Sequence, residues 1–128
     1  GYMGRLRCVQ EISAVTAACM MVKTSVFKAV GGFDEELKVA FNDIDLCMKV
    51  RKYGVKIVFT PYAELYHYES KSRGMEDTPE KQLRFSREVN CFRRKWEREL
   101  LKGDPYYNPN LTLNNTDCSL RKQEKNGD

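Results

Sequence analysis

The stretch FNDIDLCMKVRKYG, residues 41–54, decides both the fold and the function predicted for this chain. It opens with Asn42, Asp43 and Asp45, continues with apolar and basic residues, and ends at a glycine. Acidic side chains at the start, Lys and Arg near the end and a glycine stop are typical of a helix, because they complement its dipole. The sequence therefore predicts a helix from Asn42 to about Tyr53, with Asn42 as its N-cap.

The two acidic residues in the first turn of this helix allow three interpretations. They can stabilise the helix end, each by about 0.3–1 kcal/mol, they can bind a metal ion, or one can act as a catalytic base at the lip of a cleft. We reject a metal-binding DxD motif at Asp43 and Asp45, because residues two apart on a helix point about 200° apart and their carboxylates diverge. Helix-end stabilisation and catalysis both stay open on these residues alone.

The composition is that of an ordinary globular domain or part of one. The chain has 128 residues, 41% of them hydrophobic and 31% charged, and a net charge of +4. This size allows a real core, and the mild positive charge favours anionic ligands without the clustered basic stripe typical of nucleic-acid binding. Because the chain lacks an initiator Met and its first apolar segment follows almost at once, we expect it to come from a longer protein.

Cysteine and histidine usage limits the redox and metal chemistry. The five cysteines are odd in number, scattered and never in CxxC spacing, which indicates reduced thiols and a cytoplasmic protein. The single histidine excludes a multi-histidine metal site within this chain. The longest nearly apolar run, ISAVTAACMMV, has about 11 residues, whereas a membrane helix needs roughly 20.

Strand-like segments are few. Residues 12–22 are uncharged and rich in β-branched and small residues, which suits a strand buried on both faces. Residues 55–61 and 63–69 are two further strand-like runs, and a short helix before them ends at Gly31 and Gly32. The strand over residues 12–22 needs neighbouring strands, and the rest of the chain offers few.

A long helix is predicted near the C-terminus. Thr78 suits its N-cap and Pro79 its first position, and the helix should run to about Leu101. An apolar stripe recurs along it at helical spacing, formed by Phe85, Val89, Phe92, Trp96 and Leu100. The fold class is therefore α/β, with a short mixed sheet flanked by helices and a long C-terminal helix. Residues 1–116 should form the domain, and residues 117–128, with almost nothing to bury, a flexible tail.

His67 also allows two interpretations. A lone histidine in an aromatic strand-like run is commonly a packed, hydrogen-bonded residue. However, Ser70, Lys71 and Arg73 follow it in a glycine-containing loop. A neutral imidazole beside cationic side chains is a plausible place for a metal-bound diphosphate, so a ligand role stays open.

Three stretches together resemble family-two glycosyltransferases, which have the GT-A fold: SAVTAACMMVKTSVFKAVGGFDEEL, FNDIDLCMKVRKYGVKIVFTPYAELYHYESKSRG and DPYYNPNLTL. The order of GGFDE, an acidic pair opening a helix and a strand ending in His carries the resemblance, which runs from about Arg5 to Leu113. It implies the C-terminal, acceptor-side half of the catalytic domain of bacterial rhamnosyl or polysaccharide transferases, and so a partial GT-A (nucleotide-diphospho-sugar transferase-like) fold.

The resemblance also implies roles for single residues. Asp43 matches the general base that takes the proton from the acceptor hydroxyl. Asn42 stands where many relatives have an acid, so a supporting carboxylate is missing. Asp45, Thr16 and Asn42 match substrate-binding positions on the acceptor side.

On the donor side, His67 matches a histidine that helps to hold the metal in some relatives. Arg73, with Ser70 in the same loop, falls where relatives close over the nucleotide diphosphate. The implied cofactor is a divalent ion, Mg²⁺ or Mn²⁺, and it requires a DxD-bearing nucleotide-binding half that this chain lacks.

The implied function is part of an inverting glycosyltransferase that moves a hexosyl unit from a nucleotide-diphosphate sugar to a saccharide or lipid-linked acceptor. We expect it to serve bacterial cell-envelope polysaccharide synthesis, in the cytoplasm and at the inner face of the membrane. Alone, the chain should be inactive, and its bare sheet edge should promote self-association.

The competing interpretation is a non-catalytic binding or assembly module that contacts anionic partners. Its basis is a basic face on the long helix, formed by Arg84, Arg87, Arg94 and Arg98. Three acids on the same helix interrupt that face, Glu80, Glu88 and Glu97. Interspersed acids are typical of a solvated helix face and argue against nucleic acid as a partner.

Overall fold

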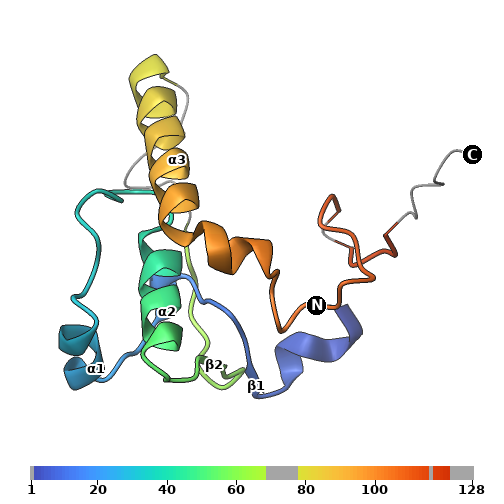
Figure 1. The fold of residues 1–128 in the computed structure, drawn as a ribbon. Coiled ribbons are helices and arrows are strands. Elements are labelled where there is room, and N and C mark those ends of the chain that lie inside the picture. Colours follow the sequence, from blue (N-terminus) through green and yellow to red (C-terminus); the bar gives the residue numbers. More distant parts are fainter. Residues whose placement is uncertain (1, 69–77, 116, 122–128) are drawn as a thin grey trace, which may run out of the picture.

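The structure is a computed structural model that describes residues 2–68, 78–115 and 117–121. Helix α2 stands at its centre, and its N-terminal turn meets the middle of the long helix α3 (Figure 1). The two short strands lie toward the other end of α2 (Figure 1). The elements in chain order are η1 (Tyr2–Arg7), β1 (Gln10–Glu11), η2 (Ala17–Cys19), α1 (Thr24–Ala29), α2 (Asn42–Lys52), β2 (Val58–Phe59) and α3 (Pro79–Leu101).

The sheet is smaller than predicted. Its two strands, β1 and β2, are antiparallel, with Gln10 opposite Phe59 and Glu11 opposite Val58. The prediction of a strand over residues 12–22 is wrong: this segment is irregular and contains the 3₁₀ helix η2. Of the run over residues 63–69, also predicted as a strand, residues 63–68 form none, and residue 69 lies outside the described residues. The expected mixed sheet is thus an antiparallel pair in the described part of the chain.

The reason is a shortage of pairing partners. A strand forms where a neighbour takes up its backbone hydrogen bonds. Beyond β1, one further bond of this kind follows, from Ile12 N to Ile57 O at 3.1 Å. Met21 is 99% exposed and Tyr66 90% exposed, so neither apolar side chain has a packing surface. The α/β character and the long C-terminal helix are confirmed, while the GT-A assignment stays a prediction.

Helix α2 begins as predicted but is capped differently. The N-cap position is Phe41, which is left-handed (φ 63°) and makes no side-chain capping bond, and Asn42 is the first helical residue. The Phe41 ring stacks on Phe92 of α3, with 5.1 Å between centroids. The amide of Ala40, just outside the helix, donates to the Glu88 carboxylate at 2.6 Å. Packing against α3 therefore replaces the predicted asparagine cap.

Helix α3 follows its predicted start and end. The hydroxyl of Thr78 accepts a bond from Lys81 N at 3.4 Å. Only the centre of the predicted stripe is buried: Phe92 and Trp96 are 6% and 4% exposed, whereas Phe85 is 44% exposed. The backbone at Trp96 is not helical, and the last turns of α3 bend away there (Figure 1).

The hydrophobic core is small and lies where three segments meet. Leu37, Phe92 and Trp96 are its buried members, with Phe41 and Met48 of the α2 region packed against them. Leu37 follows the GGFDE motif, so this loop delivers a core residue to the junction of α2 and α3.

The GGFDE turn itself depends on glycine. Gly32 has a φ of +64°, and a Cβ there would lie 3.0 Å from the ring of Phe27. A side chain at this position would therefore both strain the backbone and displace the ring of α1.

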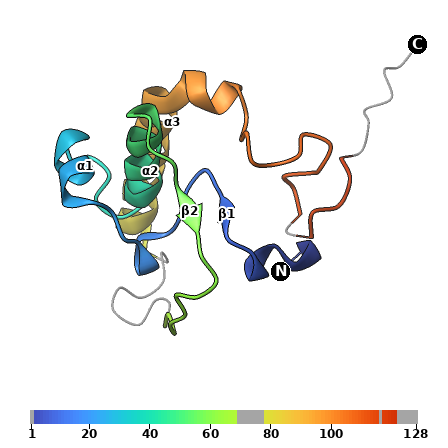
Figure 2. The ribbon, with the colours of Figure 1, turned by 90° about the horizontal axis from the view of Figure 1, so that it is seen from below.

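After α3, the chain folds back beside η1 (Figure 2). Thr112 N donates to Ser119 O at 2.8 Å, and Leu111 and Leu120 form an isolated β-bridge. Residues 117–121 are thus hydrogen-bonded to the segment before them, while 122–128 of the predicted tail lie outside the described residues. The domain boundary at residue 116 stays a prediction.

Among the described residues, none of the helices combines the length and the hydrophobicity that a membrane span requires.

Candidate functional site

Asp43 lies in the first turn of α2, half-buried, with both carboxylate oxygens oriented by backbone amides. Its Oδ2 accepts from Ala17 N at 3.1 Å, and its Oδ1 accepts from Ile44 N at 2.8 Å. Each carboxylate oxygen has two lone pairs, so each can accept one further proton donor. The carboxylate is therefore held in a fixed direction without using up its acceptor capacity.

Thr16 and Asn42 lie close to this carboxylate. Thr16 caps η2, its Oγ1 accepting from Ala18 N at 3.3 Å, and the next residue, Ala17, is the one that bonds Asp43. Thr16 is exposed, and Asn42 is half-buried beside Asp43. The structure thus brings three of the residues implied by the resemblance to one end of α2.

Asp45 has a different environment. It is 0% exposed, and its Oδ1 accepts from Trp96 Nε1 at 2.8 Å. Asp43 and Asp45 therefore bond to different elements, as expected for diverging carboxylates. The acceptor-side role implied for Asp45 does not agree with this burial, because α3 separates its carboxylate from solvent.

Two lysines surround the buried Asp45 carboxylate. Lys95 Nζ lies 2.7 Å from Oδ1, and Lys49 Nζ lies 2.9 Å from Oδ2. Burial by itself raises the pKa of Asp45, but the bonds from Lys95, Lys49 and Trp96 outweigh it, so the pKa lies below its ordinary value. Asp45 is therefore a paired, buried anion.

The same lysines reach the GGFDE loop. Lys95 also pairs with the carboxylate of Asp34, and Lys49 donates to Gly32 O at 3.0 Å. The Lys95 bond lowers the pKa of Asp34. Sequence reasoning missed these two lysines. The i, i+4 spacing of Asp45 and Lys49 was a visible signal, whereas nothing local pointed to Lys95.

Glu88 is a second acid whose environment differs from the prediction. It was expected on a solvated face of α3, yet it is 3% exposed and bonds Ala40 N, next to Phe41. Helix α3 therefore contacts the start of α2 in two places: Glu88 binds Ala40 N, and Trp96 and Lys95 bind Asp45.

His67 lies on the exposed segment after β2. Ser70 and Arg73 lie outside the described residues. Within residues 2–68, 78–115 and 117–121, no three His, Cys, Asp or Glu side chains gather as a metal site. This part of the chain offers His67 as a single candidate ligand and does not by itself fit a bound divalent ion.

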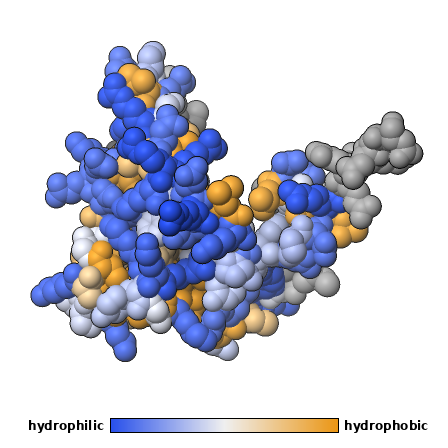
Figure 3. Space-filling view, in the orientation of Figure 1, coloured by the Kyte–Doolittle hydropathy of each residue, from blue (hydrophilic) through white to orange (hydrophobic). Residues whose placement is uncertain are grey.

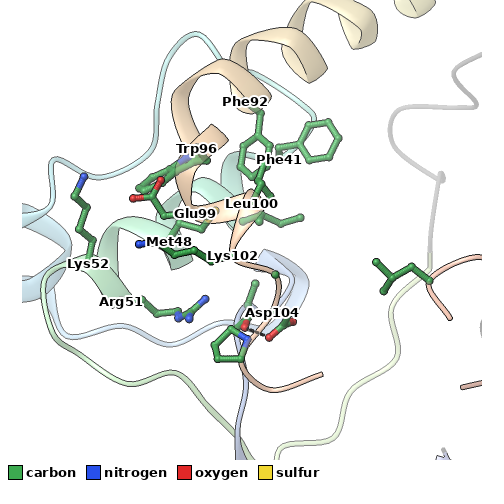
Figure 4. A pocket seen from close by; sticks show the side chains of 16 residues that line it. Phe41, Met48, Arg51, Lys52, Phe92, Trp96, Glu99, Leu100, Lys102 and Asp104 are labelled. Atoms are coloured by element: carbon green, nitrogen blue, oxygen red, sulfur yellow. Dashed lines mark hydrogen bonds between the residues drawn. The ribbon is translucent and has the colours of Figure 1, made fainter. Parts of the chain in front are cut away.

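A cavity of about 780 Å³ lies next to the site, between α2 and the end of α3. Phe41, Phe92 and Trp96 line one side, and Arg51 lies across from them (Figure 4). Ile44 lines this cavity but Asp43 does not. Asp43, the candidate base, therefore lies next to this cavity and not in its lining.

No family model matches this chain, and no solved structure matches it. Similar proteins exist among bacterial sequences. The uncharacterized protein y4gI of Sinorhizobium fredii (strain NBRC 101917 / NGR234) is 58% identical over 121 residues, which cover 94% of this chain and 13% of the relative. The O-antigen biosynthesis protein RfbC of Myxococcus xanthus is 39% identical over 115 residues, covering 90% of this chain and 9% of the relative.

A shorter match links the chain to a named glycosyltransferase. The N-acetylglucosaminyl-diphospho-decaprenol L-rhamnosyltransferase of Mycobacterium tuberculosis is 36% identical over 67 residues, covering 52% of this chain and 22% of the relative. The chain spans about an eighth or less of the first two relatives' length. The predicted resemblance is confirmed at this level: the chain is similar to a segment of O-antigen biosynthesis and rhamnosyltransferase proteins, as expected of a glycosyltransferase-like domain.

Proposed function

We propose that this chain is the acceptor-side part of a family-two, inverting glycosyltransferase within a longer protein, with Asp43 as general base. The similarity to an O-antigen biosynthesis protein and a rhamnosyltransferase supports the enzyme class. The observation that carries the assignment to Asp43 is its carboxylate geometry. Two backbone amides orient this half-buried group at a helix N-terminus and leave it lone pairs that can accept a proton.

The proposed step is a single displacement at the anomeric carbon. An acceptor hydroxyl donates its proton to Asp43 as its oxygen attacks that carbon. The carbon–oxygen bond to the nucleoside diphosphate breaks, and its electron pair leaves with the diphosphate. Attack opposite the leaving group inverts the configuration. General-base assistance of this kind contributes roughly 10²–10⁴ in rate.

The nearest groups suit recognition of a hydroxylated acceptor. Thr16 presents a hydroxyl and Asn42 an amide, and both groups can donate to and accept from sugar hydroxyls. Asn42 replaces the acid that the resemblance leads one to expect, so Asp43 would act without a neighbouring carboxylate on that side.

The donor side would come largely from outside this chain. We propose that the nucleotide diphosphate, with Mg²⁺ or Mn²⁺, is held by a DxD-bearing half of the longer protein. His67 would add one ligand, and Ser70 and Arg73 would contact the diphosphate. A divalent ion there would neutralise charge on the departing diphosphate.

The relatives' names suggest the substrate class. One acts in O-antigen biosynthesis, and the other is named for L-rhamnosyl transfer to N-acetylglucosaminyl-diphospho-decaprenol. We therefore propose a hexosyl-type donor and a saccharide or lipid-linked acceptor, with the work done in the cytoplasm or at the inner membrane face.

The test uses a longer protein that carries this chain, incubated with a panel of nucleotide sugars and saccharide or lipid-linked acceptors. Transfer from one of these donors by the longer protein, and none by the 128-residue chain alone, is expected. Transfer or nucleotide-sugar hydrolysis above background by the 128-residue chain would contradict the proposal that donor binding requires the rest of the longer protein.

The binding-module alternative has one observation in its favour. Because Glu88 is drawn inward to Ala40, the outer face of α3 loses one of its three predicted acids, and hydrophilic residues dominate that face (Figure 3). Arg87, Arg94 and Arg98 are exposed there. Steeply salt-dependent binding to anionic vesicles, with no sugar transfer in the longer protein, would favour this alternative.

A further inference from the structure

The first turn of α2 carries two carboxylates that bond in different directions. Asp43 accepts from Ala17 N at 3.1 Å, on the side of η2. Asp45 is fully buried and bonds Trp96 Nε1 at 2.8 Å, on the side of α3. Because both residues lie in one helical turn, whatever fixes the direction of Asp45 also fixes the direction of the Asp43 Cα–Cβ bond, from which the carboxylate reaches Ala17 N.

Asp45 is fixed by an ion network that spans three segments. Lys95 of α3 lies 2.7 Å from it and also pairs with Asp34 of the GGFDE loop. Lys49 of α2 lies 2.9 Å from it and donates to the Gly32 carbonyl of the same loop. The four charged groups sum to zero, so the network can be buried at the junction without an excess charge.

Stability alone is a poor account of such a network. Replacing a buried ion pair with well-packed apolar residues is often neutral or stabilising, because desolvation offsets much of the attraction. What an ion network adds is specificity, because its charged groups are all paired in only one relative position of the segments that carry them. Here it would set the rotation of α2 against α3 and the loop.

That rotation matters for the candidate base. The Cα atoms of a helix lie about 2.3 Å from its axis, and a side-chain carboxylate lies about 5 Å from it. A rotation of the helix by about 20° would therefore move the carboxylate by about 1.7 Å. Misplacing a reacting group by about 1 Å can cost about 10²-fold in rate. The bond from Ala17 to Asp43 would break at the same displacement.

We propose that Asp45 and Lys95 are positioning residues, which orient the Asp43 carboxylate toward Ala17 by fixing the rotation of α2. The functional meaning of this inference rests on the proposed function, since it treats Asp43 as the base. The positioning itself can be measured without any sugar transfer.

The experiment uses the 128-residue chain and measures backbone amide exchange with solvent by NMR at neutral pH. Lys95→Met removes the ammonium and keeps the apolar stem. Lys38→Met, at an exposed residue, is the matched control. We expect the Ala17 amide to exchange faster by about tenfold in Lys95→Met, the factor lost with one ordinary hydrogen bond. The Gln82 amide, which bonds Thr78 O at the frayed start of α3 and exchanges by local opening, should change by less than about threefold, and Lys38→Met should match the original chain.

Two results would overturn the proposal: an unchanged Ala17 amide in Lys95→Met, or equal acceleration of all amides, which would indicate lost stability alone. If Lys95→Met does not fold, Asp45→Asn gives the same test, because it keeps an oxygen for Trp96 while removing the charge. Loss of transfer in an Asp43 variant of the longer protein tests the proposed function separately, so either can fail without the other.

Discussion

The same substitution at two positions of α2, Asp45→Asn and Asp43→Asn, should have very different effects on stability. Asp45→Asn keeps the shape and an oxygen for Trp96 Nε1 but removes the charge that Lys49 and Lys95 share. Asp43→Asn makes the same chemical change at a half-buried carboxylate whose bonds are to backbone amides. The two variants therefore separate the effect of the buried ion network from the effect of the half-buried candidate base.

The magnitude follows from burial. Breaking a buried ion pair by removing one partner costs about 3–5 kcal/mol. The side chains of Lys49 and Lys95 are 18% and 31% exposed, and Lys95 keeps Asp34 as a partner. Partial access to water lowers the expected loss for Asp45→Asn to about 2–3 kcal/mol. For Asp43→Asn, which gives up one ordinary hydrogen bond, the loss should be about 1 kcal/mol or less.

Urea unfolding followed by circular dichroism measures both variants against the original chain. With a slope of about 1–3 kcal/mol/M, the midpoint should fall by about 1–2 M for Asp45→Asn and by clearly less for Asp43→Asn. Equal losses, or an Asp45→Asn midpoint within error of the original, would refute the conclusion that the charge of Asp45 matters to the fold.

Three further outcomes are expected. Hydrogen bonds from lysines lower the pKa of Asp45 and Asp34 below the ordinary value of 3.8. The stabilisation by these two carboxylates is therefore complete above about pH 4 and is lost as pH falls through their folded-state pKa. Urea midpoints should drop between pH 6 and pH 3, and they should drop less in Asp45→Asn. Gly32→Ala should destabilise the chain by at least about 1 kcal/mol, and by more than Gly31→Ala, because an added Cβ meets Phe27 at Gly32 and no atom at Gly31. In thermal unfolding, a lower melting temperature for Gly31→Ala than for Gly32→Ala would contradict this. Sedimentation should detect self-association through the bare edges of β1 and β2, and a clean monomer at high concentration would count against it.

Local sequence signals predicted the helices well. Thr78 and Pro79 fixed the start of α3, and Gly54 followed the end of α2, because capping and stop signals act within one turn. The position of Asp43 at a helix start followed from the same rules. These features depend on residues a few positions apart, which a sequence displays directly.

Features that depend on distant partners were not predictable. The strand expected over residues 12–22 needed neighbours that the described chain does not provide. The left-handed Phe41 depends on its stacking with Phe92, 51 residues away along the chain. The burial of Asp45 depends on Lys95 and Trp96, and no local pattern in the sequence indicates either contact.

The most direct test of Asp43 as the base is the turnover of Asp43→Asn in a longer protein that carries this chain, with donor binding measured in parallel. The account predicts that kcat falls by about 10²–10⁴, because an amide cannot take the acceptor proton, while the affinity for the nucleotide sugar is retained. Unchanged turnover in that variant would contradict it.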